Sequence, residues 1–210
     1  YAGVADPERM KRSLAAVREP FPSDTVPIGS PYFYFFYLAA LRRAGMHQEA
    51  LDVTRSIYGR MLDAGATTWW EHLTGHASLS HGWSTAPNFD LSTYVLGVEP
   101  TEPGFVAFRV EPQPASLRWA RGIIPAVGGD IQVEWHQDAG QFELRVQVPM
   151  PARVELSVPA RDAEGTLLEP PSAERKEFHG GRVRLWVRGP GSFRVRSVLE
   201  APRRSVGDPE

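Results

Sequence analysis

Cysteine is absent from the 210 residues, and its absence removes several kinds of chemistry at once. Without thiols the chain forms no disulfide, no thiolate metal site and no cysteine nucleophile. A long hydrophobic run is also missing, because the richest stretch, residues 32–41, has polar neighbours too close for it to cross a bilayer. We therefore expect neither thiol-based catalysis nor a membrane-spanning segment.

Positive and negative charges are nearly balanced. The 23 Lys and Arg residues and the 25 Asp and Glu residues give a formal net charge of −2 and are spread along the chain. A chain of this kind has no electrostatic footprint for a polyanion or an anionic membrane, so nucleic acid and membrane are not expected as partners. A signal-peptide pattern is missing as well, and Tyr1 is not a methionine, so we expect that an N-terminal portion precedes this sequence.

Helical spacing of apolar residues extends to about Gly97. The signature Asp6-Pro7-Glu8 predicts the start of a helix that ends before Pro20. A second helix follows Ser30-Pro31, is apolar nearly all round, and ends near Gly45, so we expect it to be buried. A third covers residues 47–64 and a fourth residues 87–96. Because two residues separate the second from the third, these two should form an antiparallel hairpin.

Alternation of apolar and polar residues begins at about Phe105. Residues 131–135 and 142–148 alternate on either side of the turn Gln137-Asp138-Ala139-Gly140, which predicts a β-hairpin. Further strands are predicted at residues 154–158, 183–187 and 193–198. This spacing favours an antiparallel β-sandwich. The Pro- and Gly-rich residues 99–104 mark the boundary, giving a helical unit (1–98), a β-sandwich (99–200) and a flexible tail (201–210).

Potentially reactive side chains concentrate between the third and fourth helices. The segment Ala66-Thr67-Thr68-Trp69-Trp70-Glu71-His72 is followed by Ser78-Leu79-Ser80-His81-Gly82-Trp83-Ser84. Indole faces offer flat apolar platforms for a sugar ring, and a carboxylate beside them suits carbohydrate chemistry. Residue type alone favours a packed tryptophan anchor, a solvated carboxylate and a structural histidine over a catalytic site.

Other clusters of polar residues favour ordinary roles. Histidines 72, 76 and 81 near Glu71 lack the spacing of a zinc motif, so neither a metal nor another cofactor is expected. In the second half, two alternating sets of polar residues fit solvated strand faces rather than sites. These sets are Asp130, Glu134 and His136, and Arg182, Arg184 and Arg188.

Several phrases resemble the end of the catalytic domain of bacterial α-L-rhamnosidases. They are Gly29-Ser30-Pro31-Tyr32-Phe33, the stretch from Met61 to Glu71 (Met-Leu-Asp-Ala-Gly-Ala-Thr-Thr-Trp-Trp-Glu), Ser78-Leu79-Ser80-His81-Gly82-Trp83-Ser84 and Tyr94-Val95-Leu96-Gly97-Val98. Pro103-Gly104-Phe105, Trp119-Ala120-Arg121-Gly122 and Gly129-Asp130-Ile131 resemble the entry into that family's C-terminal β-domain. The similarity is ordered and covers residues 1–136.

The resemblance implies the last helices of an (α/α)6 barrel followed by an antiparallel β-sandwich. It implies an inverting glycoside hydrolase that releases terminal α-L-rhamnose from a glycoside or polysaccharide. Glu71 matches the family's general base and His81 a histidine near that base; the stretch between them is shorter than in many relatives, which leaves His81 less secure. Trp69, Trp70 and Trp83 would line the sugar subsite.

The partner carboxyl group of this mechanism lies upstream in the family. Asp63 and Asp90 are rejected as substitutes, because both are expected within turns at helix ends. We therefore expect little hydrolase activity from the chain alone, and an apolar helix surface that requires the missing N-terminal part of the barrel or an oligomeric partner. Two alternatives remain: a non-catalytic carbohydrate-binding or scaffold module, and an (α/α)6 glycosidase for another sugar.

Overall fold

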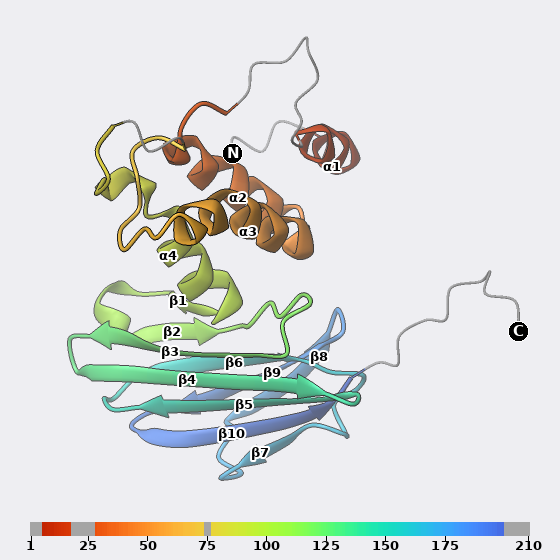
Figure 1. Ribbon diagram of the computed structural model, residues 1–210. Helices are drawn as coiled ribbons and strands as arrows, with labels where there is room; N and C mark the ends of the chain where they lie inside the picture. Colours follow the sequence, from red (N-terminus) through yellow and green to blue (C-terminus); the bar gives the residue numbers. More distant parts are fainter. Residues whose placement is uncertain (1–5, 18–27, 74–76, 200–210) are drawn as a thin grey trace, which may run out of the picture. The chain divides into compact units, whose positions relative to one another are not determined.

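The computed structural model describes residues 6–17, 28–73 and 77–199 (Figure 1). The chain divides into two compact units, residues 1–91 and residues 92–210. The first unit is helical and the second is built from two β-sheets. The segment 201–210, expected as a flexible tail, lies outside the described residues.

The helical unit begins where its capping residues predict. The side chain of Asp6 accepts a hydrogen bond of 2.9 Å from the backbone N–H of Arg9, which confirms the predicted cap of the first helix. The elements are α1 (Pro7–Ala16), α2 (Pro31–Arg43), α3 (His47–Asp63), a 3₁₀ turn η1 (Gly82–Ser84) and α4 (Ala86–Asp90). A π-helical turn, η2 (Leu91–Val95), continues α4, so the fourth helix extends almost as far as predicted but with a change of winding. No helix in the described part of the chain is long and apolar enough to span a membrane.

Helices α2 and α3 form the predicted hairpin. Their shared core is apolar and consists mainly of Tyr34, Leu38, Leu41, Ile57, Tyr58 and Met61. Gly45 closes α2 with a φ of 74°, a left-handed conformation that glycine adopts at little cost. The prediction that α2 is buried all round is wrong within this unit: Tyr32, Phe33 and Phe36 are exposed, because α1, α3 and α4 cover only the other sides of the helix.

A buried ion pair joins α2 to α4. The guanidinium of Arg42 donates to both oxygens of Asp90, from Nε at 3.0 Å and from Nη2 at 2.6 Å. Their side chains are 0% and 3% exposed, and Arg42 also donates to the carbonyl of His47. The side chain of Arg42, at the end of α2, is therefore bonded both to the start of α3 and to the end of α4.

The β unit consists of two five-stranded sheets. One has the order β1-β2-β6-β9-β8 and the other β3-β4-β5-β10-β7 (Figure 1). The first contains β1 (Val98–Pro100), β2 (Ala107–Val110), β6 (Arg153–Pro159), β8 (Arg175–His179) and β9 (Arg182–Arg188). The second contains β3 (Trp119–Ala126), β4 (Gly129–Asp138), β5 (Gln141–Val148), β7 (Leu167–Glu169) and β10 (Gly191–Val198). A 3₁₀ turn, η3 (Pro103–Phe105), lies between β1 and β2.

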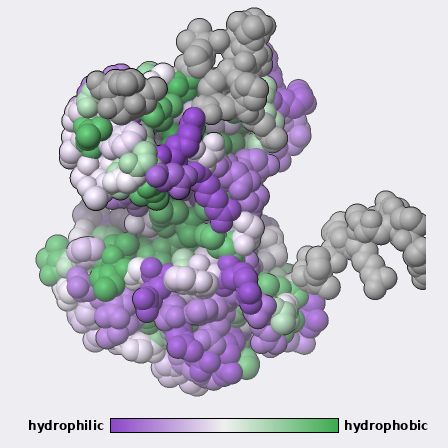
Figure 2. All heavy atoms as spheres, in the orientation of Figure 1, coloured by the Kyte–Doolittle hydropathy of each residue, from purple (hydrophilic) through white to green (hydrophobic). Residues whose placement is uncertain are grey.

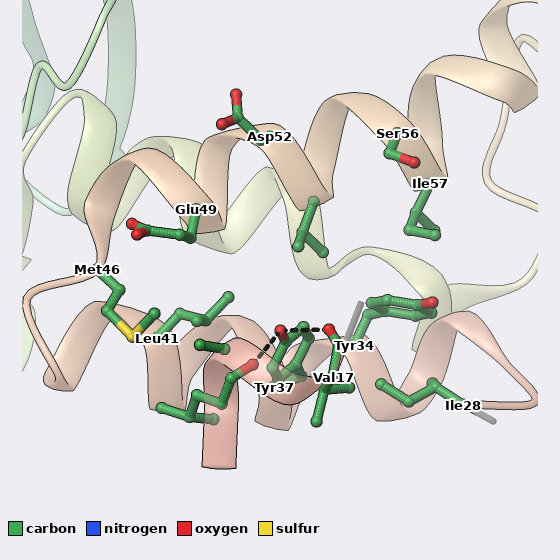
Figure 3. A pocket seen from close by; sticks show the side chains of 13 residues that line it. Val17, Ile28, Tyr34, Tyr37, Leu41, Met46, Glu49, Asp52, Ser56 and Ile57 are labelled. Atoms are coloured by element: carbon green, nitrogen blue, oxygen red, sulfur yellow. Dashed lines mark hydrogen bonds between the residues drawn. The ribbon is translucent and has the colours of Figure 1, made fainter. Parts of the chain in front are cut away.

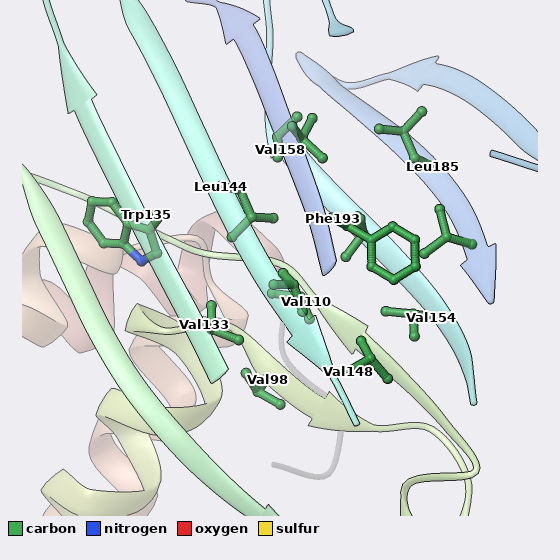
Figure 4. Close-up of a cluster of buried hydrophobic side chains, with 14 of the residues drawn as sticks. Val98, Val110, Val133, Trp135, Leu144, Val148, Val154, Val158, Leu185 and Phe193 are labelled. Carbon is green, nitrogen blue, oxygen red and sulfur yellow. The ribbon is translucent and has the colours of Figure 1, made fainter. Parts of the chain in front are cut away.

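The core of the β unit lies between its sheets and follows the alternating pattern of the sequence (Figure 4). Trp135 of β4 is fully buried, stacks on Phe142 of β5 at 5.8 Å, and donates from Nε1 to the carbonyl of Val95 at 2.9 Å. Val95 and Val98 belong to this core, so the residues before the expected boundary at 98/99 pack with the β unit, and the division by contacts falls after Leu91.

Two features of the β unit differ from the sequence expectation. All pairings are antiparallel except that of β2 with β6, which is parallel with Ala107 opposite Arg153. Arg182, expected on a solvated face, is largely buried and donates to the Ser157 hydroxyl and to the carbonyls of Ser157 and Pro112. These acceptors come from segments distant in sequence, which is why the alternation of β9 alone did not reveal them.

Candidate active site

Two segments between α3 and α4 lie side by side through backbone hydrogen bonds. The N–H of Glu71 donates to the carbonyl of Ser78 at 2.8 Å, and the N–H of His81 donates to the carbonyl of Trp69 at 2.9 Å. The hydroxyl of Thr68 donates to the carbonyl of Leu79. These bonds hold the two reactive motifs of the sequence next to each other.

Glu71 and His81 face each other across this pairing. Glu71 Oε2 lies 3.9 Å from His81 Nδ1, with the two side chains 25% and 32% exposed. The same oxygen accepts a hydrogen bond of 3.3 Å from the N–H of Ser78. No described residue donates a hydrogen bond to Oε1. The carboxylate is thus oriented through one oxygen while the other can contact water or a ligand.

Aromatic rings continue from this pair. The ring centroid of Trp83 lies 4.3 Å from that of His81 and 5.6 Å from that of Tyr32, at the beginning of α2. Trp83 is 48% exposed. An exposed indole beside a carboxylate offers an apolar platform for a sugar ring.

Trp69 and Trp70 occupy a different environment. Trp69 meets the buried Tyr58 edge to face at 5.3 Å and donates from Nε1 to Asn88 at 2.8 Å. Trp70 packs against the same hydrophobic core. Both indoles therefore anchor the loop to the helical unit, whereas the indole of Trp83 contacts the ring of His81.

Tyr58 of α3 packs against the loop that carries the site. Its hydroxyl donates to the carbonyl of Pro31 at 3.2 Å, and its ring contacts Trp69. Burial raises the pKa of Tyr58 well above its ordinary value, so the hydroxyl stays protonated and remains a donor. Tyr32, Tyr58 and Asn88 were not predicted as site residues, since their proximity to the motifs comes only from helix packing.

The alternative carboxylates have structural positions. Asp90 is held in the buried pair with Arg42, and Asp63 lies exposed at the end of α3. His76, one of the three histidines considered as metal ligands, lies outside the described residues. Within residues 6–17, 28–73 and 77–199, no group of three or more His, Cys, Asp or Glu is arranged to hold a metal ion.

Comparison with known proteins gives a consistent assignment. The family model for the bacterial alpha-L-rhamnosidase C-terminal domain matches residues 97–169. An α-L-rhamnosidase of Alteromonas sp. (strain LOR) is 34% identical over 112 residues, covering 47% of this chain and 12% of that protein. The GH78 family rhamnosidase of Bacillus sp. GL1 is 36% identical, with a TM-score of 0.61, over 73% of this chain and 18% of that one.

The chain is similar to bacterial α-L-rhamnosidases, and its residues 97–169 match the model of their C-terminal domain. Its fold is shared with more distant rhamnosidases, including that of Streptomyces avermitilis, whose crystal structure was solved in complex with L-rhamnose. That structure is 20% identical, with a TM-score of 0.70 over 78% of this chain and 17% of its own. The chain spans less than a fifth of the length of these relatives.

Proposed function

We propose that this chain forms the C-terminal part of an inverting glycoside hydrolase that releases terminal α-L-rhamnose, with Glu71 as general base. The observation that carries the proposal is the pair Glu71 and His81, placed 3.9 Å apart in a chain of rhamnosidase sequence. The substrate is a rhamnose-containing glycoside or polysaccharide. In the same proposal, residues 1–98 are the end of an (α/α)6 barrel and residues 99–200 its C-terminal β-domain.

Inversion requires two carboxyl groups about 6.5–9.5 Å apart, on opposite sides of the scissile bond. One protonates the leaving oxygen while the other removes a proton from the attacking water. Glu71 is suited to the second task, because the Ser78 N–H fixes Oε2 and no described donor occupies Oε1. Water bound at Oε1 would lose its proton to that oxygen as its own oxygen bonds to the anomeric carbon. The acid belongs to a segment outside this chain.

The neighbouring side chains receive distinct roles. His81 keeps Glu71 oriented or binds a sugar hydroxyl, and Trp83 stacks on the C–H face of the sugar. Trp69 and Trp70, expected at the same subsite, support the loop from the core side instead. Tyr32, Phe33 and Phe36, exposed on α2, would be covered by the remainder of the barrel or by an oligomeric partner.

The reaction is tested with a rhamnosidase that carries this sequence at its C-terminal end. A panel of aryl glycosides should show turnover of the α-L-rhamnoside and not of other sugars. Proton NMR of the first product formed should show the β-anomer of rhamnose. Preferred turnover of another sugar would favour the alternative (α/α)6 glycosidase, and an initial α-anomer would exclude inversion.

The base is tested by replacing Glu71 with glutamine, which keeps the size of the side chain and removes its basicity. We expect kcat to fall by roughly 10²–10⁴-fold with little change in substrate binding. Glu49→Gln, on α3, is the matched control and should leave kcat unchanged. Sugar binding without turnover in the unmodified enzyme would instead support the carbohydrate-binding module.

A further inference from the structure

The outward face of the sheet β3-β4-β5-β10-β7 contains a broad depression of about 700 Å³. Backbone and inward residues of the central strands, such as Val133, Val146 and Phe193, form its floor. Side chains of the outward residues form its walls. Figure 2 shows the visible side of this sheet as predominantly hydrophilic.

Neutral hydrogen-bonding groups form one row across the strands. Gln132 of β4 pairs with Gln147 of β5, which in turn pairs with Ser192 of β10. The described residues form no hydrogen bond with either amide. Each amide presents donors and an acceptor in one plane, which matches the adjacent hydroxyls of a sugar.

Charged groups form the next row and neutralise one another. Arg145 is opposite both Glu134 and Arg194, and Glu143 accepts hydrogen bonds from Arg145 at 2.7 Å and from Arg194 at 2.6 Å. Arg121, Arg145 and Arg194 line the depression together with Glu134 and Glu169, and Glu143 pairs with Arg145 and Arg194 beside it. Because Arg145 and Arg194 are already paired with carboxylates, this face suits an uncharged polar ligand better than a polyanion.

Apolar groups border the depression along β3. Ile123 lines it, and Trp119, which faces the same side two residues before Arg121, lies opposite His136. Both Trp119 and Ile123 are 59% exposed. Large apolar side chains beside planar polar groups are the combination that binds the two kinds of surface of a sugar ring.

We propose that this face of the β unit is a second carbohydrate-binding surface, distinct from the Glu71 site, that takes an uncharged saccharide chain. Five strands spaced about 4.8 Å apart give it a width of roughly 19 Å, enough for several sugar units. The amides bind hydroxyls, the paired charges hold the walls in place, and Trp119 and Ile123 contact the apolar faces of the sugars.

The surface is tested by affinity gel electrophoresis of the 210-residue chain in gels containing a soluble rhamnan, a neutral polymer of L-rhamnose. We expect the polymer to retard the chain, and Gln132→Ala/Gln147→Ala or Trp119→Ala to weaken the retardation about tenfold or more. Glu177→Ala, on the exposed edge strand β8 of the other sheet, and Trp83→Ala, at the helical site, should be retarded as strongly as the unmodified chain. Circular dichroism checks that each variant is folded.

Three results would overturn the proposal. They are the absence of retardation by rhamnan, equal retardation of the Gln132/Gln147 variant, and loss of retardation in Trp83→Ala, which would locate binding at the helical site. Stronger retardation by an acidic polysaccharide than by rhamnan would overturn the choice of a neutral ligand. This test is independent of the proposed reaction, because substitutions in the depression should leave turnover of a small aryl rhamnoside unchanged.

Discussion

Replacing Asp90 by asparagine separates a structural carboxylate from a catalytic one. Asp90 and Arg42 are 3% and 0% exposed and make two hydrogen bonds, at 3.0 and 2.6 Å. Asparagine keeps the shape but removes the negative charge, and it turns an NH₂ group towards the guanidinium. Breaking a buried pair by removing one partner costs about 3–5 kcal/mol of unfolding free energy. For a small helical unit this is a large share of the total stability.

The assay is urea unfolding followed by circular dichroism at 222 nm, a signal dominated by α1 to α4 of the helical unit. Asp63→Asn, an exposed carboxylate at the end of α3, is the control and should change the unfolding free energy by less than about 0.5 kcal/mol. Arg42→Met/Asp90→Leu should recover most of the loss, because an apolar pair needs no charge compensation.

An unfolding free energy of Asp90→Asn within about 1 kcal/mol of that of the unmodified chain would contradict a structural role for the ion pair. A second refuting result would come from the enzyme that contains this chain. If Asp90→Asn lowered kcat there by about a hundredfold or more while the fold stayed intact, Asp90 would be part of the catalytic machinery.

Three further predictions concern the β unit and the isolated chain. Trp135→Ala removes a fully buried indole and its bond to the Val95 carbonyl, and should lower the unfolding free energy by about 3–5 kcal/mol in urea titrations followed by fluorescence; an unchanged midpoint would contradict the core assignment. Burial acts to raise the pKa of Glu143, but hydrogen bonds from Arg194 and Arg145 outweigh it and hold that pKa below 4.5, so the stabilisation is present above pH 4.5 and is lost as pH falls through the lower, folded-state pKa. Glu143→Gln should therefore flatten this part of the pH dependence of the melting temperature, and an identical profile would count against the network. The 210-residue chain alone should not hydrolyse an aryl rhamnoside, because the proposal places the general acid outside it; robust turnover would show that both groups are present.

Local patterns in the sequence predicted the helical hairpin and the central β-hairpin well. Asp6, Gly45 and the turn at Ala139-Gly140 each act within a few residues, through a cap or a left-handed backbone conformation. Alternation around Trp135 is equally local, because one face of the strand is buried. Such features need no knowledge of distant partners.

Features that depend on distant partners escaped prediction. The parallel pairing of β2 with β6 joins two strands between which the chain passes through β3, β4 and β5 of the other sheet. Strand β3 was missed because its inward residues are small or only half-buried, among them Ala120 and Gly122. The burial of Arg182 likewise depends on acceptors at Pro112 and Ser157.

The candidate site likewise combines features that the sequence predicts with features that depend on distant partners. Residue types and the family resemblance selected Glu71, His81 and Trp83, but only backbone pairing of the two segments places Glu71 near His81. The contact of Tyr32 with Trp83 depends on the packing of α2 against the loop. The anchoring of Trp69 by Asn88 likewise depends on the position of α4.

Rescue of a Glu71→Ala variant by azide tests the role of Glu71 most directly. The measurement is the rate of aryl α-L-rhamnoside cleavage, with and without azide, by an enzyme that carries this chain. Azide needs no base to attack, so it should bond to the anomeric carbon as the aryloxide leaves, restoring turnover and giving the β-configured rhamnosyl azide. If azide leaves the rate of the variant unchanged, or if the variant is as active as the unmodified enzyme without it, Glu71 is not the general base.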